Sequence, residues 1–508
     1  MPDTRRLRVE SLEDRLTPAS AGSLDPTFGN NGIASFTTAA VERLAVVPDG
    51  RILALISTGT FVPLTLERYE PNGAIDTSFG TNGAVTTPVS GSASSTPKLT
   101  ALPDGGALIA WEGVSNNGFA SSFDVVRVTA AGAIDTTFGT GGTAVVPLPA
   151  NTTQADLAAI VVQSDGQILV AGDETPAPLV HDTAQLYDLV VARLTATGQA
   201  DTSFGTGGTA VLSDPTGTVT TLQAGGLAVQ PDGRIVVAGD GSTSHFLGGM
   251  GSYEPAAVRL TVTGQFDPSF GNAGIARIGF PQAGIFGTFQ SVSVLADGGL
   301  LLAGNVLPSS GAYVGAAARL TAAGQLDPSY GTAGLAVTGT LTPNGAPTVN
   351  TAIDSSGRAV FDATSFTSEG NVNNNNVFRL TADGAVDTGF GTNGEVAVSS
   401  LPGLNTLDAT KVNLEPGLAA LPNGDILLGG TVGMAKLAGS TPPAGFVAAT
   451  TGTLVAGGPA GGTIQVLNPT SGTYSLAGTV TAFPGFAGNV RVATADVNGD
   501  GIPDYIFG

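Results

Sequence analysis

Oxygen-bearing side chains recur at short, regular intervals near the C-terminal end of the sequence. Aspartate or asparagine stands at positions 1, 3, 5 and 9 of one stretch, glycine stands at position 6, and position 7 can offer a backbone carbonyl. Calcium takes about six to eight oxygen ligands at this kind of spacing, with the glycine permitting a sharp turn. The stretch therefore predicts a Ca²⁺ site, and a plain Asp/Asn/Gly turn is the alternative. The predicted ligands are Asp496, Asn498, Asp500, Ile502 and Asp504.

The two histidines and the single tryptophan are the other candidates for chemistry. His181 and His245 fall in corresponding connections of successive sequence repeats, Trp111 ends an apolar run in the repeat before them, and Asp182 follows His181. A histidine beside a carboxylate can serve general acid–base catalysis or weak metal binding. These four residues form a candidate ligand patch, whereas isolated histidines on surface loops are the bland interpretation. No residue is assigned a catalytic role.

Composition excludes several other kinds of chemistry. The chain of 508 residues has no cysteine and two histidines, so disulfides, thiolate nucleophiles, Cys-ligated zinc and a three-histidine metal site within one chain are excluded. Its formal charge of -21 opposes binding to nucleic acid or to an anionic membrane surface. No run of 18 apolar residues occurs, so we expect no transmembrane segment.

One phrase, Gly-x-x-Asp-x-x-Phe/Tyr-Gly-x-x-Gly, is repeated along the chain at a period of about 60 residues. A second phrase, mostly Asp-Gly between two short apolar runs, alternates with it and is a strong hairpin signal. A basic residue stands eight positions before each motif aspartate from the second copy onward. The seven motif aspartates are Asp25, Asp76, Asp135, Asp201, Asp267, Asp327 and Asp387.

Each repeat is thus expected to hold four strands. The first follows the motif, the second and third flank the Asp-Gly turn, and the fourth carries the basic residue. Seven such units without helical periodicity predict an all-β, seven-bladed β-propeller of four-stranded blades. A β-solenoid is the alternative, but its coils repeat at shorter periods.

Length variation between the copies separates two faces of the expected disc. The connections through the motif and the Asp-Gly turn are constant, whereas the other two connections of each repeat vary in length. Because function tends to reside on variable loops held by a rigid scaffold, we expect binding on the variable face or at the mouth of the axial channel. The motif aspartates are then structural and accept backbone N–H bonds, while the motif aromatic residues wedge between blades. A catalytic carboxylate in every copy is the rejected alternative.

The repeats over residues 22–437 resemble the delta-60 repeat, a bacterial β-propeller repeat of large surface or secreted proteins. The resemblance implies a propeller and an extracytoplasmic setting but no reaction. The opening residues, with Leu12, Glu13, Arg15, Pro18 and Ala19, are similar to the start of many planctomycete extracellular proteins. Residues 1–21 are therefore expected to be a targeting or disordered segment. Residues 438–445 are predicted to form a linker, and residues 446–508 resemble an incomplete FG-GAP segment, the integrin-type blade whose loop binds calcium.

Together these features predict a non-enzymatic extracellular or cell-surface propeller that serves as a binding, display or adhesion module, with calcium in its C-terminal loop. Its partner is an unknown protein or glycan, and the chain is expected to be a monomer or part of a larger surface protein. The alternative is a secreted polysaccharide-active hydrolase or lyase. Such an enzyme should show two carboxylates about 5–10 Å apart in a pocket.

Overall fold

The structure is a computed structural model that describes most of the chain. The described residues are 20–35, 40–57, 62–90, 97–114, 120–149, 152–176, 187–215, 221–242, 253–280, 283–309, 311–341, 348–366, 372–398, 417–430 and 433–439. Beyond residue 439 the backbone of five strands is described.

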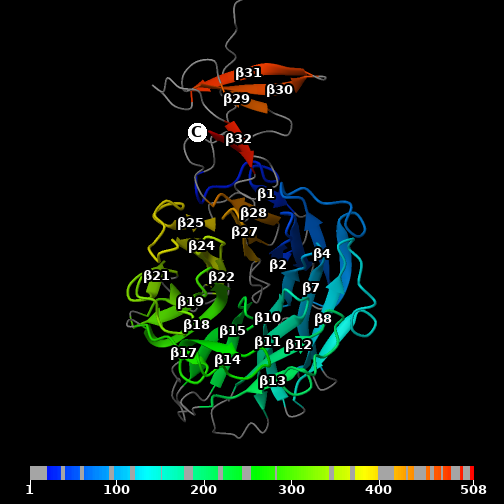
Figure 1. Ribbon diagram of the computed structural model, residues 1–508, viewed down its shortest axis with the longest axis vertical. Coiled ribbons are helices and arrows are strands. Elements are labelled where there is room, and N and C mark those ends of the chain that lie inside the picture. The colour runs from blue at the N-terminus through cyan, green and yellow to red at the C-terminus, as the bar shows by residue number, and fades with distance from the viewer. Residues whose placement is uncertain are drawn as a thin grey trace, which may run out of the picture.

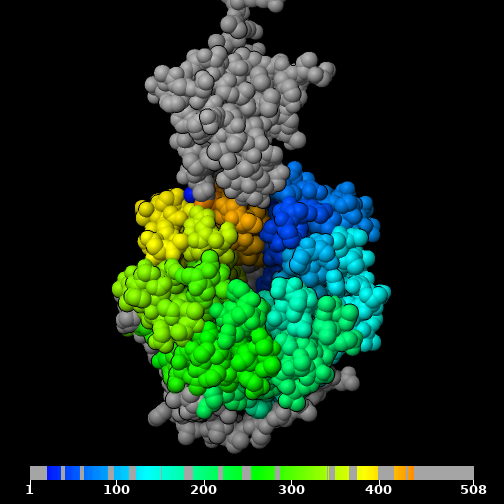
Figure 2. Space-filling model, viewed as in Figure 1, coloured from blue at the N-terminus to red at the C-terminus, as the bar shows by residue number. Residues whose placement is uncertain are grey.

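Within these residues the protein is all-β, and no α-helix occurs. Seven four-stranded antiparallel sheets form a ring of blades, which confirms the predicted propeller. Figure 2 shows the coloured blades arranged around a central hollow. The ring is the scaffold on which any functional residue is placed.

The first four blades follow one another along the chain. Blade 1 contains β2 (Ala40–Val46), β3 (Ile52–Ser57), β4 (Pro63–Tyr69) and β5 (Ala84–Ser90). Blade 2 contains β6 (Lys98–Ala101), β7 (Ala107–Val114), β8 (Ala120–Val128) and β9 (Thr143–Pro147). Blade 3 contains β10 (Thr152–Val162), β11 (Ile168–Pro176), β12 (Asp188–Leu194) and β13 (Thr209–Leu212). Blade 4 contains β14 (Thr221–Val229), β15 (Ile235–Ser242), β16 (Tyr253–Leu260) and β17 (Ile275–Arg277).

The remaining blades complete the ring, and blade 7 takes its fourth strand from the N-terminal end. Blade 5 contains β18 (Ala283–Val294), β19 (Leu300–Pro308), β20 (Val314–Leu320) and β21 (Leu335–Thr340). Blade 6 contains β22 (Thr348–Ile353), β23 (Ala359–Phe366), β24 (Val372–Leu380) and β25 (Glu395–Ala397). Blade 7 contains β26 (Leu418–Ala420), β27 (Ile426–Gly429), β28 (Gly433–Leu437) and β1 (Ile33–Ser35). The later strands are β29 (Leu454–Gly457), β30 (Thr463–Thr470), β31 (Thr473–Thr481), β32 (Val492–Ala495) and β33 (Asp504–Phe507).

The strand order within a blade differs from the sequence prediction by one strand. The strand after each motif was expected to be the first strand of a blade. It is instead the fourth and outermost strand of the blade that precedes the motif, as β5 is in the order β2-β3-β4-β5. The reason is that the motif connection is the short, constant one, so it forms a hairpin within a sheet. The variable connection that follows crosses to the next blade.

This shift explains how the ring closes. The first motif strand, β1, has no preceding blade and pairs antiparallel with β28, with Ile33 opposite Ala435. The N-terminal and C-terminal parts of the repeat region are thereby joined in one sheet, which removes the free edge that an open ring would leave.

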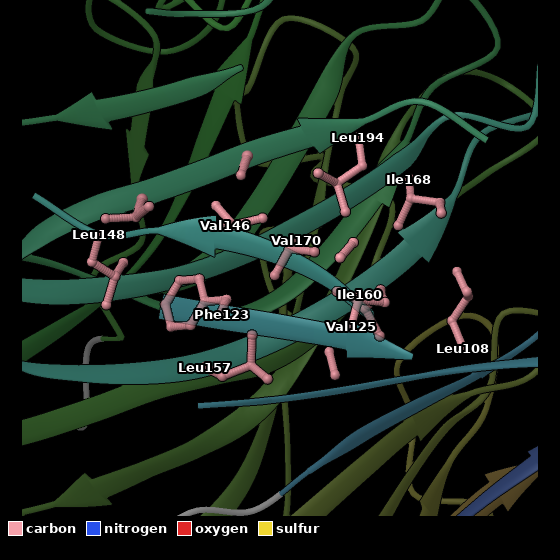
Figure 3. Close-up of a cluster of buried hydrophobic side chains, with 14 of the residues drawn as sticks. Leu108, Phe123, Val125, Val146, Leu148, Leu157, Ile160, Ile168, Val170 and Leu194 are labelled. Atoms are coloured by element: carbon pink, nitrogen blue, oxygen red, sulfur yellow. The ribbon is translucent and has the colours of Figure 1, made fainter. Parts of the chain in front are cut away.

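The apolar core is divided into seven clusters, one between each pair of neighbouring blades. In β11, Ile168 and Val170 face the cluster shared with blade 2, whereas Leu169 and Ala171 face the cluster shared with blade 4. Figure 3 shows the first of these, where Phe123 and Leu157 of adjacent blades lie in one cluster. Because both faces of the second strand are buried, that strand is a continuous apolar run.

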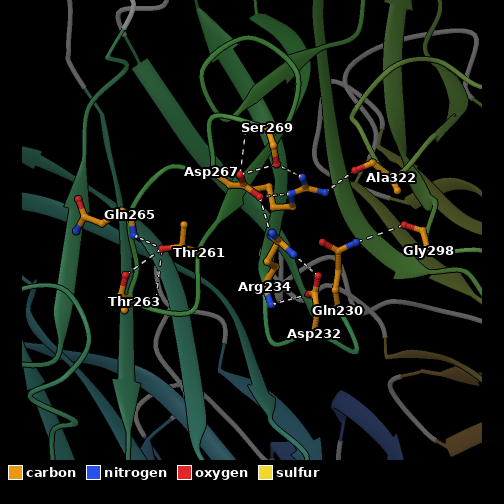
Figure 4. Close-up of polar contacts among 11 residues, drawn as sticks. Gln230, Asp232, Arg234, Thr261, Thr263, Gln265, Asp267, Ser269, Gly298 and Ala322 are labelled. Atoms are coloured by element: carbon orange, nitrogen blue, oxygen red, sulfur yellow. Dashed lines mark hydrogen bonds and ion pairs between the residues drawn. The ribbon is translucent and has the colours of Figure 1, made fainter.

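The motif aspartate joins a turn to the strand that carries the basic residue. In blade 4, Asp267 Oδ1 accepts a hydrogen bond from Ser269 N (3.0 Å), and Asp267 Oδ2 pairs with Arg259 Nε (2.9 Å) (Figure 4). Arg259 also donates to the carbonyl of Ala322 in the next blade and stacks over Phe270. The seventh pair forms across the ring closure, where Lys436 Nζ lies 3.2 Å from Asp25 Oδ2. The basic residue therefore contacts both its own motif and, in most copies, the neighbouring blade.

A closed ring of backbone hydrogen bonds links the seven motifs. The N–H of the glycine after each motif aromatic residue donates to the carbonyl that precedes the first glycine of the next motif, from Gly29 to Asn72 around to Gly391 and Ala21. The motif aromatic side chains are almost completely buried. A Cβ on Gly132, which has φ 78°, would collide with the backbone of Gly80 (2.2 Å) and with the ring of Phe79 (2.9 Å), so the contact between blades 1 and 2 requires a glycine here.

Two faces of the disc can be distinguished by these contacts. Arg51 and Arg234, which follow Asp-Gly turns, pair with the motif aspartates Asp76 (3.1 Å) and Asp267 (2.8 Å). The Asp-Gly turns and the motif turns therefore lie on the same face. The connections of variable length leave from the other ends of the strands, as antiparallel alternation requires.

Candidate functional site: the axial channel

The first strand of every blade lines the axis of the ring. Each of β2, β6, β10, β14, β18, β22 and β26 contacts the corresponding strand of both neighbouring blades, and β26 contacts β2. A cavity of about 330 Å³ is lined by residues of all seven strands or the residue just before one. This volume lies at the lower end of the range for small-molecule sites.

Two cations lie on neighbouring walls of this cavity. Arg43 of β2 and Lys98 of β6 both line it. Each stands six residues before the aspartate of its Asp-Gly turn, Asp49 or Asp104, so the two residues lie at about the same height along the channel. At about 3.3 Å per residue, that height is roughly 20 Å from the turns, toward the variable face.

Asp156 of β10 faces the same cavity from the third blade. Burial raises the pKa of Asp156, and the ammonium group of Lys98 opposes that rise. Asp173 stands directly opposite Asp156 in the β10–β11 pairing, on the same face of the sheet. Burial, together with the neighbouring Asp156 carboxylate, raises the pKa of Asp173 to about 8.

Further acidic side chains lie next to the cavity wall. Each comes from the second strand of one blade and points to the innermost strand of the next blade. Glu112 Oε1 accepts a hydrogen bond from Leu157 N (2.9 Å), and Asp173 Oδ1 accepts one from Ala224 N (3.2 Å). Burial raises the pKa of Asp240 to about 7, and the side chain of Thr288 opposes that rise. Leu157 and Ala224 immediately precede β-bulges, so Glu112 and Asp173 hold backbone groups that the bulges release from the ladder. Their role in the wall is structural.

The far wall is polar without charge. Thr288 and Gln290 of β18 line it, beside Asn350 and Thr351 of β22. Gln290 Oε1 is buried and has no hydrogen-bond partner among the described residues. An unpaired buried acceptor costs about 1–3 kcal/mol, which a donor on a bound molecule would recover.

A larger hollow of about 520 Å³ lies at the outer rim between blades 4 and 5. It is lined largely by motif residues such as Gly271, Asn272 and Gly324. These three are uncharged turn residues that recur in other blades, and the one charged residue in the lining, Arg277, pairs with Glu254. The rim hollow is therefore a consequence of the motif geometry, and the axial cavity is the better candidate.

Of the four residues of the ligand patch predicted from the sequence, the structure describes Trp111 alone. Trp111 lies on β7, half-buried against the apolar cluster between blades 1 and 2. His181, Asp182 and His245 lie outside the described residues, so the patch remains a prediction.

The predicted calcium ligands Asp496, Asn498, Asp500 and Ile502 also lie outside the described residues. Asp504 is the first residue of β33, which pairs antiparallel with β32 so that Ala495 is opposite Asp504. Residues 496–503 therefore connect two paired strands. In the described part of the chain, no group of three or more His, Asp or Glu side chains could hold a metal ion.

The residues that line the channel are not among those predicted from the sequence. The signal was present: Arg43, Lys98 and Asp156 are charged residues inside the run before an Asp-Gly turn, where a strand between blades should be apolar. The buried acids carried a signal too, since Asp173 and Asp240 each follow Ala-Gly at the same place after the turn. A charge repeated on the first or second strand points to the axis of a propeller.

The comparison with family models agrees with the fold. The model described as "Domain of unknown function (DUF5122) beta-propeller" matches residues 163–204, 230–270, 295–330 and 363–390. Each match spans one motif, in blades 3 to 6, and together they cover well under half of the chain. No curated protein matches the sequence.

Several solved structures are distantly similar. A protein of unknown function from Dyadobacter fermentans is 14% identical, with a TM-score of 0.35 over 68% of this chain and 93% of that one. A protein from Lactobacillus plantarum is 14% identical, with a TM-score of 0.39 over 68% of this chain and 83% of that one. Prolyl oligopeptidase B from Galerina marginata is 11% identical, with a TM-score of 0.38 over 93% of this chain and 55% of that one. Likeness at this level says nothing about activity.

The blades, the repeated motif and the family match define a class: the chain is a β-propeller repeat protein. The propeller has seven blades, and charged and polar side chains line its axial channel. Among the residues described, no helix is long and apolar enough to cross a membrane.

Proposed function

We propose that the protein is a non-enzymatic binding module whose ligand enters the axial channel from the variable face. The observation that carries this proposal is the cavity of about 330 Å³ to which all seven blades contribute. It combines two cations, one carboxylate and a wall of amides and hydroxyls, which is the mixture that fixes a polar ligand in place.

The same lining argues against hydrolysis. Glycosidases need two carboxylates that both reach the substrate. Among the described residues that line the cavity, Asp156 is the single carboxylate. Its neighbour Asp173 is only 3% exposed and bonds to the backbone of β14.

A polysaccharide-active hydrolase or lyase is the second candidate, and one observation favours it. Asp173 has its pKa raised to about 8 and stands beside Asp156. A protonated carboxyl next to a second carboxyl is the arrangement of an acid and its partner in sugar hydrolysis. If a conformational change opened Asp173 to the channel, the pair could act in this way.

Glycan-array and protein pull-down screening of the intact chain tests the binding proposal. The screen is run beside an assay for reducing ends released from the same polysaccharides. We expect saturable binding without product, and Asp156→Asn should alter affinity only. Release of reducing ends that Asp156→Asn abolishes would show that the protein is a hydrolase and not a binding module.

We also propose an extracellular or cell-surface location and a calcium ion in the loop between β32 and β33. The delta-60-like repeats and the planctomycete-type opening support the location. The calcium proposal is supported by the donors Asp496, Asn498, Asp500 and Asp504, with the carbonyl of Ile502, on a connection between paired strands. Such a loop resembles that of an FG-GAP repeat.

Calorimetry of the intact chain with CaCl₂ tests the metal site. We expect binding heat that Asp500→Asn abolishes, whereas Asp165→Asn, at an exposed Asp-Gly turn, serves as the control that retains it. Absence of binding heat at millimolar Ca²⁺ would show that the loop does not bind calcium. Detection of the native protein only inside unbroken cells would contradict the extracellular location.

A further inference from the structure

Blade 6 contains a group of buried oxygen atoms that have no hydrogen-bond partner. Asp362 and Thr364 of β23 are each 1% exposed, and Asn375 lies beside them on β24. Asp362 Oδ1, Thr364 Oγ1 and Asn375 Oδ1 are buried and accept no hydrogen bond from the described residues. Buried polar atoms in proteins are nearly always bonded, so these three oxygens indicate a site for a bound species.

The three side chains lie on the face of blade 6 that packs against blade 7. Val360 and Val377 belong to the apolar cluster shared by these two blades. Val377 stands directly opposite Asp362, and Thr364 stands directly opposite Asn375. Because side chains alternate along a strand, Asp362 and Thr364 share the face of Val360. The unpaired oxygens are therefore in the interface between blades 6 and 7, beside its apolar cluster.

Blade 6 departs from the other blades at two of these positions. Five residues after the turn glycine, where blade 6 has Asp362, the other blades have an apolar residue or glycine, namely Leu55, Ala110, Ala171, Ala238, Ala303 and Gly429. Four residues before the basic residue of the next strand, where blade 6 has Asn375, they have Leu64, Phe123, Leu189, Pro255, Gly315 and Val432. The repeat itself therefore does not require a polar group at either position, and both departures lie on the same face of one blade.

The spacing of the three side chains suits a small cation. Residues directly opposite each other, such as Thr364 and Asn375, have Cβ atoms about 4.5–5.5 Å apart. Asp362 is two residues along the same strand from Thr364, a separation of roughly 6.6 Å between their Cα atoms. Oxygen ligands on opposite sides of a hard cation are about 5 Å apart, so side chains at these separations can share one ion.

The charge of the site favours a monovalent cation. Asp362 is the one carboxylate, and Asn350, directly opposite on β22, donates a hydrogen bond to it. Among the described residues, no basic side chain forms an ion pair with Asp362. Buried charges in proteins are paired or coordinate metals. Sodium or potassium balances a single carboxylate, whereas calcium would leave a net positive charge in the interface.

We propose that a monovalent cation, sodium or potassium, binds between blades 6 and 7 and is held by Asp362, Thr364 and Asn375. The site has a single carboxylate, so it differs in kind from a cluster of three or more acidic or histidine side chains, which the described residues lack. The ion stabilises the interface next to blade 7, the blade that closes the ring through the three-residue strand β1. This role is structural and is independent of the ligand proposed for the channel.

Thermal unfolding of the intact chain in NaCl, KCl, CaCl₂ and choline chloride at one ionic strength tests this proposal. The protein carries Asp500→Asn, so that the calcium loop proposed above does not contribute. An ion that binds the folded state alone raises the melting temperature. We expect NaCl or KCl to raise it by about 2 °C or more above its value in choline chloride. Equal melting temperatures in NaCl, KCl and choline chloride would overturn the site, and a larger rise in CaCl₂ than in either would overturn the choice of ion.

Matched variants locate the ion. Asp362→Ala gives blade 6 the residue that four other blades have at this position. It should abolish the rise in NaCl or KCl, yet melt in choline chloride no lower than the unchanged protein, because it removes a buried acid with an unpaired oxygen. Asp165→Ala, at an exposed turn, is the control that should keep the rise. A rise that Asp362→Ala retains would overturn the proposal. If Asp362→Ala does not fold, Thr364→Val removes an unpaired hydroxyl with little change of shape and supplies the same comparison.

Discussion

The motif aspartates offer a comparison within one molecule, because the same turn is built with a buried ion pair in some copies and an open one in others. Asp76 Oδ2 lies 2.7 Å from Arg68 Nε, and the two side chains are 4% and 3% exposed. Asp135 Oδ2 lies 3.8 Å from Arg127 Nε, and these side chains are 21% and 28% exposed. Both aspartates accept a backbone hydrogen bond within the turn at 3.0 Å, from Ser78 or Thr137.

Asp76→Ala and Asp135→Ala therefore lose the same turn bond but different ion pairs. Asp76→Ala also removes the partly exposed pair with Arg51 (3.1 Å), but Arg51 keeps its pair with Asp49. The turn bond contributes about 1 kcal/mol in both cases. Breaking a buried pair costs about 3–5 kcal/mol, because the remaining charge is left without a partner, whereas an exposed pair contributes about 0–1 kcal/mol. Asp76→Ala should thus reduce the free energy of unfolding by roughly 3 kcal/mol more than Asp135→Ala does.

Urea unfolding followed by tryptophan fluorescence measures this difference. Trp111 packs against the cluster that contains Phe79, so the single tryptophan reports on the interface next to Asp76. Circular dichroism must give the same transition for the two-state treatment to hold. Equal losses in the two variants would refute the assignment of the difference to burial of the Arg68–Asp76 pair.

A second substitution checks the cause. Arg68→Met added to Asp76→Ala removes the unpaired guanidinium, so the double variant should recover part of the stability that Asp76→Ala loses. A double variant that is less stable than Asp76→Ala would show that Arg68 acts mainly through its bond to Ala130 and its stacking on Phe79.

Three further predictions follow from the same structure. The free energy of unfolding should fall as the pH rises from about 4 to 8, because Asp173 and Asp240 have folded-state pKa values of about 8 and 7 and the unfolded chain releases these protons at lower pH. Each such buried carboxyl lowers stability by about 1.4 kcal/mol per pH unit between its unfolded and folded pKa values. Melting temperatures measured across this range test the prediction, and a flat profile would contradict it. Ala273→Asn should raise the free energy of unfolding by about 0.5–1 kcal/mol, since Ala273 has φ 52°, where alanine is disfavoured and every other copy except that with Ala333 carries Asn or Gly. No gain in stability against urea would show that the turn is not strained. Removal of residues 1–35 should leave blade 7 without its outer strand and lower the melting temperature sharply, whereas an unchanged value would show that β1 does not close the ring.

Much of the fold could be predicted from the sequence because its signals are local. The Asp-Gly turns, the motif glycines and the alternating apolar runs each determine a hairpin within a few residues. The number of blades follows from counting them. The pairing of β1 with β28 could not be predicted in this way, because the two strands lie about 400 residues apart and local turn chemistry says nothing about such partners.

The candidate site was less accessible to the same reasoning. A lysine or arginine within a strand, such as Lys98 or Arg43, has the appearance of a solvated face until seven strands are arranged around one axis. Asp173 and Asp240 look like ordinary turn acids after Ala-Gly, and only burial between blades reveals their raised pKa values. Trp111, which stands out in composition, packs against an apolar cluster, whereas charges that break a repeated apolar pattern line the cavity.

A crystal structure of the intact chain with a glycan selected from the array tests the central claim most directly. The account predicts an uncleaved glycan whose terminal unit lies in the axial cavity, in contact with residues of several blades. A glycan bound at the outer rim, or cleaved products in the channel beside an exposed Asp173, would contradict it.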